Sequence, residues 1–177
     1  DAAARREEIM AKQTLAALQQ LNEAMFGAYN AHDAAGVLEL LTDDITWDAP
    51  DGHYVGKTEV GAALEELFDA FPDASWPMED VVLMLTPDHK MGAVTWTMKG
   101  TQTGSYNGLP ATGKHVELSG VTLVTMTGPK VSGLVLQFDA YDYLTQLGVV
   151  PSTEGVGFKM LAMTEFSINK AKEALHL

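Results

Sequence analysis

The 177-residue sequence contains no cysteine, only two arginines and no long uninterrupted run of hydrophobic residues. Without cysteine the chain has no disulfide, no thiol nucleophile and no zinc–thiolate site. A helix that crosses a bilayer needs about 20 consecutive apolar residues. We therefore expect neither a redox framework nor a membrane-spanning helix.

Positive charge is scarce as well, because 11 Lys and Arg residues are outnumbered by 24 Asp and Glu residues, for a net charge of −13. Such a surface repels phosphate backbones and anionic lipid, so neither nucleic acid nor a membrane is an expected partner. The five histidines show no HxH or HExxH spacing, and no phosphate loop or dinucleotide fingerprint is present. We expect no metal and no cofactor.

The composition is that of a folded domain, with 46% hydrophobic and 20% charged residues. The length fits one domain. We assign residues 1–151 to this domain, including an extended N-terminal helix, and residues 152–177 to a C-terminal helical extension that buries one amphipathic face. A soluble protein is expected and the cytoplasm is favoured, although a signal peptide removed before Asp1 would leave no trace.

Apolar spacing and capping residues predict the helices. Residues 5–31 carry apolar side chains three and four positions apart, which is typical of one long amphipathic helix. Asp33 is expected to cap a short second helix and Thr58 a third. Asp142 is expected to cap a helical turn that ends near Gly148.

The second half of the chain has the composition of β-strands, rich in Val, Thr and Trp and punctuated by Gly and Pro. Strands are predicted at residues 45–48, 81–85, 91–102, 114–126 and 131–140. Helices followed by long antiparallel strands predict an α+β fold in which a curved antiparallel sheet forms a cone with helices on its concave face. A small apolar ligand could occupy such a cone.

Two stretches resemble the SnoaL-like polyketide cyclases, also called ester cyclases, of the nuclear transport factor two-like superfamily. The first comprises Gly100–Gly104 and Asn107–Lys114, which are similar to the family pattern G-T-H-x-G followed by G-x-P-P-T-G-[KR]. The second is Asp139 with Tyr143–Pro151, similar to a strand-terminal Asp followed by Q-L-G-x-x-P. The resemblance covers residues 14–151 and implies a cystatin-like α+β barrel.

The resemblance also implies cofactor-independent acid/base chemistry, such as an intramolecular aldol cyclisation or an isomerisation of a small apolar carbonyl compound. Asp139 matches the family's general acid/base. Gln102 stands where the family often has His, and Ala111 where it often has Pro. Because Gln does not titrate, proton transfer at position 102 is in doubt.

Asp139 is the predicted catalytic residue. It ends a strand in which Val135, Gln137 and Asp139 share one face while Leu136 and Phe138 share the other. A carboxyl group that faces an apolar pocket has a raised pKa and can exchange protons near neutral pH. The alternative is a turn aspartate that binds the backbone at the strand end.

Five further residues are predicted to bind substrate. Gln102 and Gln137 could donate hydrogen bonds to a carbonyl or enolate oxygen, with cross-strand pairing as the alternative. Tyr29 and Trp47 could form pocket walls or belong to the ordinary core. His53 lies in a Gly-rich turn, where a solvent-exposed histidine is the alternative.

Two other functions remain open. One is a non-catalytic module that binds a small ligand or mediates dimerisation. The other is a hydrolase, such as an epoxide hydrolase, although the only arginines, Arg5 and Arg6, lie outside the expected pocket. A homodimer is expected through the apolar sheet face left uncovered by helices, with Leu134, Leu136 and Phe138 or their alternates at the interface.

Overall fold

A computed structural model describes residues 2–153, 155–157, 159–160 and 163–164 of the chain. The helices of the domain are α1 (Ala2–Asn30), α2 (Ala34–Glu39), α3 (Gly56–Ala70) and α4 (Ala140–Gln146), with a short 3₁₀ helix, η1, at Met78–Asp80. The strands are β1 (Leu41–Ala49), β2 (Gly52–Val55), β3 (Val82–Leu85), β4 (Met91–Thr101), β5 (His115–Thr127) and β6 (Lys130–Phe138). The order of helices and strands along the chain agrees with the prediction, except that β2 occupies residues expected to form a turn.

The six strands form one sheet in the order β2-β1-β6-β5-β4-β3. The α+β class is confirmed, and two details of the prediction are corrected. Strands β1 and β6 run parallel, with Trp47 opposite Leu134, so the sheet is mixed rather than wholly antiparallel. The sheet is also open, because β2 and β3 are its two edges. The relative direction of β1 and β6 depends on the path of the chain between them, which no local pattern determines.

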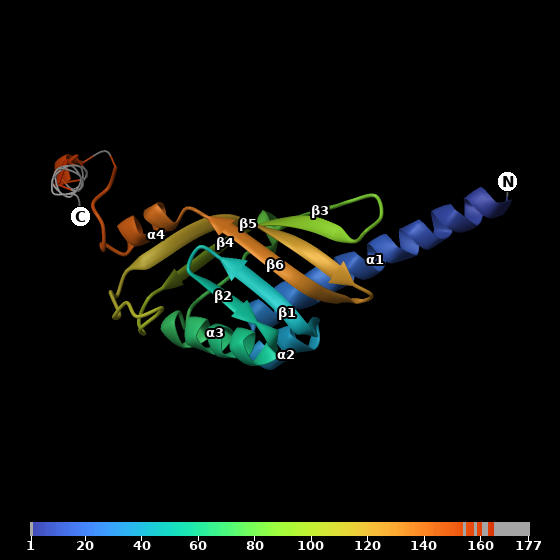
Figure 1. Ribbon diagram of the computed structural model, residues 1–177, viewed down its shortest axis with the longest axis horizontal. Coiled ribbons are helices and arrows are strands. Elements are labelled where there is room, and N and C mark those ends of the chain that lie inside the picture. Colours follow the sequence, from blue (N-terminus) through green and yellow to red (C-terminus); the bar gives the residue numbers. More distant parts are fainter. Residues whose placement is uncertain (1, 154, 158, 161–162, 165–177) are drawn as a thin grey trace, which may run out of the picture.

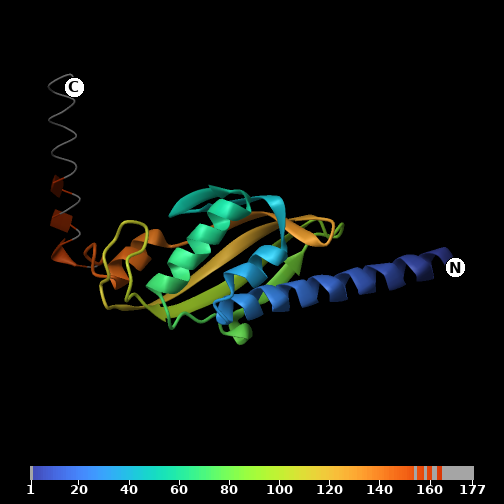
Figure 2. The same cartoon turned by 90° about the horizontal axis from the view of Figure 1, so that it is seen from below.

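Helices α1, α2 and α3 lie on the concave face of the sheet, as predicted, and α4 lies at its end (Figures 1 and 2). Helix α3 packs on β1 and β2, and α2 contacts both α1 and α3. Helix α1 runs along the sheet, and its N-terminal part extends beyond it. The core between these layers contains Phe71, Leu41, Ile45 and Leu64, all nearly inaccessible to solvent. The sheet and α1 therefore form two walls of one interior.

The alternation along β6 decides which side chains enter this interior. Leu134, Leu136 and Phe138 point inward, and Val135 and Gln137 are exposed on the outer face. Of the β6 side chains predicted for a dimer interface, Leu134, Leu136 and Phe138 are therefore excluded, and only their alternates, such as Val135, could contribute. The exposed hydrophobic side chains Val82, Met84, Met91, Leu123 and Val135 all belong to strands of the sheet. The homodimer stays a prediction.

Two predicted helix caps are wrong. Helix α3 begins at Gly56, before Thr58, and the Val55 amide donates to Glu59 Oε2 (2.8 Å). Helix α4 is capped by Asp139, not by Asp142, because α4 begins directly after β6. The cap of α2 by Asp33 is confirmed, with the Gly36 amide donating to Asp33 Oδ1 at 2.9 Å.

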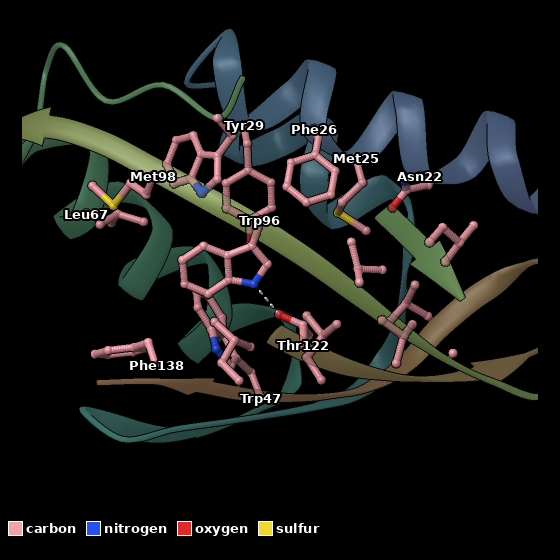
Figure 3. Close-up of a pocket in the computed structure, with 18 of the residues that line it drawn as sticks. Asn22, Met25, Phe26, Tyr29, Trp47, Leu67, Trp96, Met98, Thr122 and Phe138 are labelled. Carbon is pink, nitrogen blue, oxygen red and sulfur yellow. Dashed lines mark hydrogen bonds between the residues drawn. The ribbon is translucent and has the colours of Figure 1, made fainter. Parts of the chain in front are cut away.

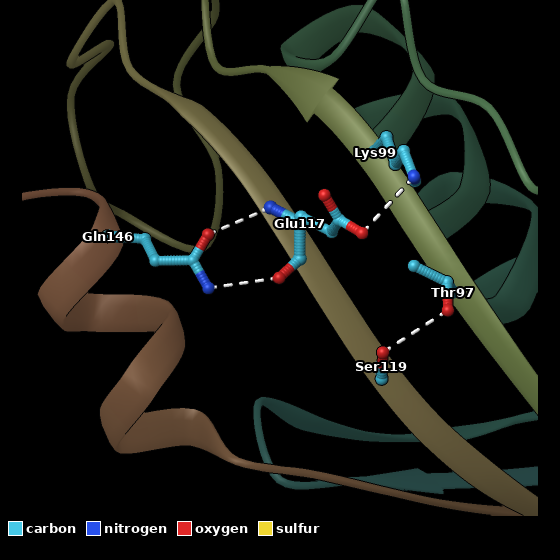
Figure 4. Close-up of polar contacts among 5 residues, drawn as sticks. All are labelled: Thr97, Lys99, Glu117, Ser119 and Gln146. Carbon is cyan, nitrogen blue, oxygen red and sulfur yellow. Dashed lines mark hydrogen bonds and ion pairs between the residues drawn. The ribbon is translucent and has the colours of Figure 1, made fainter.

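Helix α4 is fastened to β5 by a single side chain (Figure 4). Strand β5 extends past the end of β6, whose last pair joins Phe138 to Gly120, so the backbone of Glu117 has no strand beside it on that side. Gln146 replaces the missing strand: its Oε1 accepts from the Glu117 amide (2.8 Å) and its Nε2 donates to the Glu117 carbonyl (3.0 Å). Satisfying exposed strand-edge groups in this way holds α4 in place.

Most of the predicted C-terminal extension lies outside the described residues, so its helical packing stays a prediction. Within the part that is described, Val156, Met160 and Met163 are exposed. Among the described residues, no helix has the length and apolar character needed to cross a membrane.

Candidate functional site

A pocket lies between α1 and the concave face of the sheet (Figure 3). Its volume is about 150 Å³. The walls come from α1, the inner faces of β3 to β6, and the segment that follows α3. Its aromatic lining consists of Phe26, Tyr29, Trp47, Phe71, Trp76, Trp96, Tyr106, Phe138 and Tyr143. All three tryptophans of the chain therefore face this pocket.

The middle of the pocket is aromatic, and the indole N–H of Trp96 there has a hydrogen-bond partner within the protein. The Trp96 indole donates to Thr122 Oγ1 at 2.8 Å, and its ring lies against Gly120, where a Cβ would come within 2.4 Å of the indole. Any larger residue at position 120 would displace that ring. The rings of Tyr29 and Trp76 pack at a tilt of 56°, with their centroids 5.1 Å apart, and burial raises the pKa of Tyr29 well above its usual range. Tyr29 is therefore neutral at physiological pH.

One end of the pocket is polar, and it contains Trp47, Asp51, Tyr106 and Tyr143. Asp51 is the only charged residue among the described residues that line the pocket. The Tyr106 hydroxyl donates to Asp51 Oδ2 at 2.9 Å, and the Asn107 amide donates to the same oxygen at 3.2 Å. Both of these hydrogen bonds end on Oδ2.

Two buried groups of the polar end have no hydrogen-bond partner among the described residues: Trp47 Nε1 and Tyr143 Oη. Burial, and then the charge of Asp51, raise the pKa of Tyr143 to about 12. The hydroxyl is therefore protonated at neutral pH and can donate. A buried donor without a partner costs free energy unless a ligand or water satisfies it. Two unpartnered donors and a carboxylate that line one pocket can bind an oxygen-bearing group.

The polar end is assembled from three separate segments. Asp51 lies in the turn between β1 and β2, Tyr106 in the loop after β4, and Tyr143 in α4. The backbone of Gln102 holds the two ends of this loop together. Its N–H donates to the Lys114 carbonyl (2.9 Å), and its backbone carbonyl accepts from the Gly113 N–H (2.9 Å).

Of the predicted site residues, the structure brings Tyr29 and Trp47 to the pocket wall. Gln102 is fully buried but does not line the pocket, and its Oε1 accepts from Thr112 Oγ1 at 2.8 Å. His53 is exposed and contacts the carboxylate of Asp48. Gln137 lies on the outer face. Binding roles for Tyr29 and Trp47 stay predictions, and the positions of Gln102, His53 and Gln137 do not support such roles.

The predicted orientation of Asp139 is wrong. Its side chain is exposed and does not line the pocket. Asp139 Oδ1 instead accepts from the Asp142 amide at 2.9 Å and caps α4. Because Leu136 and Phe138 occupy the inner face of β6, Asp139 falls with Gln137 on the outer set. The alternative interpretation, an aspartate that binds the backbone at the strand end, describes its geometry.

Of the residues of the polar end, only Trp47 was predicted from the sequence. Asp51 was not among the predicted site residues, although a carboxylate two residues from a strand end was a usable signal. Tyr143 lies inside the second family-like stretch, and Tyr106 falls between the two parts of the first. Their convergence on Asp51 had no signal in the spacing, because it depends on contacts between residues up to 92 positions apart in the sequence.

These features define a class of protein: an α+β domain with an open, curved sheet, helices on its concave face and an apolar pocket between them. A family model of the SnoaL-like domain matches residues 22–133. The chain belongs to this family, which the sequence resemblance indicated. A search of curated proteins found no match.

Solved structures with the same fold include a candidate polyketide cyclase from Pseudomonas putida KT2440, which is 25% identical, with a TM-score of 0.65 over 71% of this chain and 94% of that one. TsrD from Streptomyces laurentii is 22% identical, with a TM-score of 0.66 over 76% and 97%. AclR from Streptomyces galilaeus, a candidate hydroxylase, is 24% identical, with a TM-score of 0.63 over 75% and 96%. The last two likenesses show the fold alone.

Proposed function

We propose that this SnoaL-like protein is a cofactor-independent acid/base enzyme that deprotonates an apolar carbonyl compound, with Asp51 rather than Asp139 as the base. The observation that carries the proposal is the polar end of the pocket. The Asp51 carboxylate lines the same pocket as two unpartnered donors, Trp47 Nε1 and Tyr143 Oη. The candidate cyclase from Pseudomonas putida supports the choice of reaction class.

The chemistry follows from these groups. Asp51 Oδ1 removes a proton from the carbon between two carbonyl groups, and the electron pair of the broken C–H bond moves onto the carbonyl oxygen. Trp47 and Tyr143 donate to that enolate oxygen, whose charge they stabilise. The enolate carbon can then form a bond to a second carbonyl carbon. The π electron pair of that carbonyl, which is a further carbonyl of the same molecule, moves onto its oxygen to give an alkoxide. Protonated Asp51 then returns the proton to the alkoxide, which leaves Asp51 as it began.

The arrangement of Tyr106 and Asn107 suits this role. Their hydrogen bonds both end on Oδ2 and orient the carboxylate, and Oδ1 is the oxygen that we assign as the base. Burial, and then the charge of Asp51, raise the pKa of Tyr106 well above its usual range, so Tyr106 keeps its proton and remains a donor to Asp51. The apolar walls exclude water, which strengthens each of these interactions.

The test is deuterium exchange, because it detects deprotonation without knowledge of the product. Aryl and alkyl 1,3-dicarbonyl compounds are incubated with the protein in D₂O, and the loss of the α-proton signal is followed by NMR. Asp51→Asn should slow exchange by about 10²- to 10⁴-fold. Asp139→Asn is the matched control, since it makes the same chemical change outside the pocket and should exchange at the wild-type rate.

Equal rates for wild type and Asp51→Asn would overturn the assignment of Asp51. A second candidate function, non-catalytic binding of a small apolar ligand, is favoured by the almost wholly apolar lining. It predicts that the compounds bind while wild-type protein leaves their exchange rates unchanged. Hydrolysis of an epoxide has less support, because no arginine is present among the described residues of the pocket.

A further inference from the structure

The pocket runs along the length of the sheet. On β5 it is lined from Leu118 to Met126, and eight residues of extended strand span about 26 Å. Strand pairing fixes the two ends: Met126 lies opposite Val131 at the start of β6, and Gly120 lies opposite Phe138 at its end. The lining residues are spread over that length, so the pocket is an elongated channel rather than a round cavity.

The chemistry of the walls changes along this channel. The polar end, with Asp51 and Tyr143, lies beyond Phe138 because both follow the last residues of β1 and β6. The middle is aromatic, and Figure 3 shows Trp96 facing the side chains of α1. The opposite end, which we call the aliphatic end, is lined by Leu18, Leu21, Leu83, Leu85, Val124 and Met126.

A polar group at one end and an aliphatic tail at the other are the features of an extended ligand. We propose that the ligand of this channel is an elongated, uncharged, single-chain carbonyl compound whose carbonyl head binds at the polar end and whose alkyl tail lies along the aliphatic end. This proposal rests on the proposed function only for the position of the head.

The absence of positive charge narrows the class further. None of the described lining residues is Lys, Arg or His, and Asp51 carries a negative charge beside the site for the head. A carboxylate or phosphate head would be repelled there and would find no counter-ion. A neutral ester or ketone, in contrast, accepts hydrogen bonds from Trp47 and Tyr143.

The experiment is a chain-length series of methyl 3-oxoalkanoates, from about six to about sixteen carbons, titrated below their micelle concentrations. Intrinsic fluorescence reports binding directly, because Trp47, Trp76 and Trp96 are the only tryptophans and all line the channel. Affinity should rise by roughly threefold to fourfold per added methylene until the chain fills the aliphatic end. The free acid of each chain should bind more weakly than its methyl ester.

A larger side chain at the aliphatic end distinguishes binding in the channel from non-specific hydrophobic binding. Val124→Phe should weaken binding of the longest esters by about tenfold or more and leave the shortest unchanged. Leu123→Phe is the matched control, since the Leu123 side chain is next to Val124 in the sequence but is 45% exposed on the outer face of the same strand. Leu85→Phe, with Met84→Phe as its control, repeats the comparison on β3 in case Val124→Phe fails to fold.

Affinity that does not depend on chain length would overturn the proposal, and so would equal effects of Val124→Phe on short and long esters. These readouts are independent of turnover. If the esters bind with the expected length dependence but Asp51→Asn exchanges deuterium as fast as wild type, the proposed catalysis fails and the ligand class stands. If deuterium exchange depends on Asp51 but affinity does not depend on chain length, the proposed catalysis stands and the ligand class fails.

Discussion

Removing the cap of α4 tests the assignment of Asp139 as a structural residue. Asp139→Ala deletes the acceptor of the 2.9 Å hydrogen bond from the Asp142 amide. Loss of an N-cap typically lowers the free energy of unfolding by about 1 kcal/mol. The effect should reach the core, because α4 carries Tyr143 and is followed by Leu147, which are 8% and 2% exposed.

Asp139→Asn separates capping from catalysis. Asn is as good an N-cap as Asp, so its unfolding free energy should match that of wild type within a few tenths of a kcal/mol. For a chain of this size, about 1 kcal/mol corresponds to a fall in Tm of roughly 2–4 °C, expected only for the alanine variant. Urea unfolding followed by tryptophan fluorescence provides the free energy, and the deuterium-exchange assay provides the activity.

The reasoning would be refuted if Asp139→Asn kept full stability but lost deuterium exchange. That result would mean that the carboxylic acid itself reacts, and that the exposed position of Asp139 in this structure is not the one used in catalysis. Equal destabilisation by Ala and Asn would also count against the cap.

Three further predictions follow from single contacts. Tyr143→Phe removes a buried hydroxyl that has no partner among the described residues, so the variant should be at least as stable as wild type by urea unfolding, yet exchange deuterium more slowly. Gln102→Ala opens a hole at a fully buried position and removes the acceptor of Thr112, which should lower the free energy of unfolding by about 2 kcal/mol; an unchanged urea midpoint would contradict it. Hydrogen bonds from the Thr101 amide and hydroxyl hold the pKa of Asp73 below its ordinary value of 3.8. A carboxyl group whose pKa is lower in the folded state than in the unfolded state stabilises the fold when the pH is above the unfolded-state pKa, and this stabilisation is lost as the pH falls through the folded-state pKa. Asp73→Ala should therefore be less stable than wild type at pH 7, and this difference should shrink below pH 3.8.

Local patterns in the sequence determined most of the secondary structure and the fold class. The spacing of apolar residues predicted α1, and the Val- and Thr-rich runs predicted β4 and β5 with ends displaced by one residue. These features are local, because helix and strand periodicity depends on residues a few positions apart. The two family-like stretches then identified the family. One of them also contains Gln146, which the structure shows fastening α4 to β5.

The tertiary structure alone decided which face of each element is used. Alternation along β6 separated Phe138 from Asp139 correctly, but it could not tell which set faces the pocket, because both patterns have the same period. The answer depends on the parallel pairing of β6 with β1 and on α1 across the sheet. In the same way, Asp51, Tyr106 and Tyr143 meet only because three distant segments converge at one end of the sheet, and no local spacing encodes contacts over such separations.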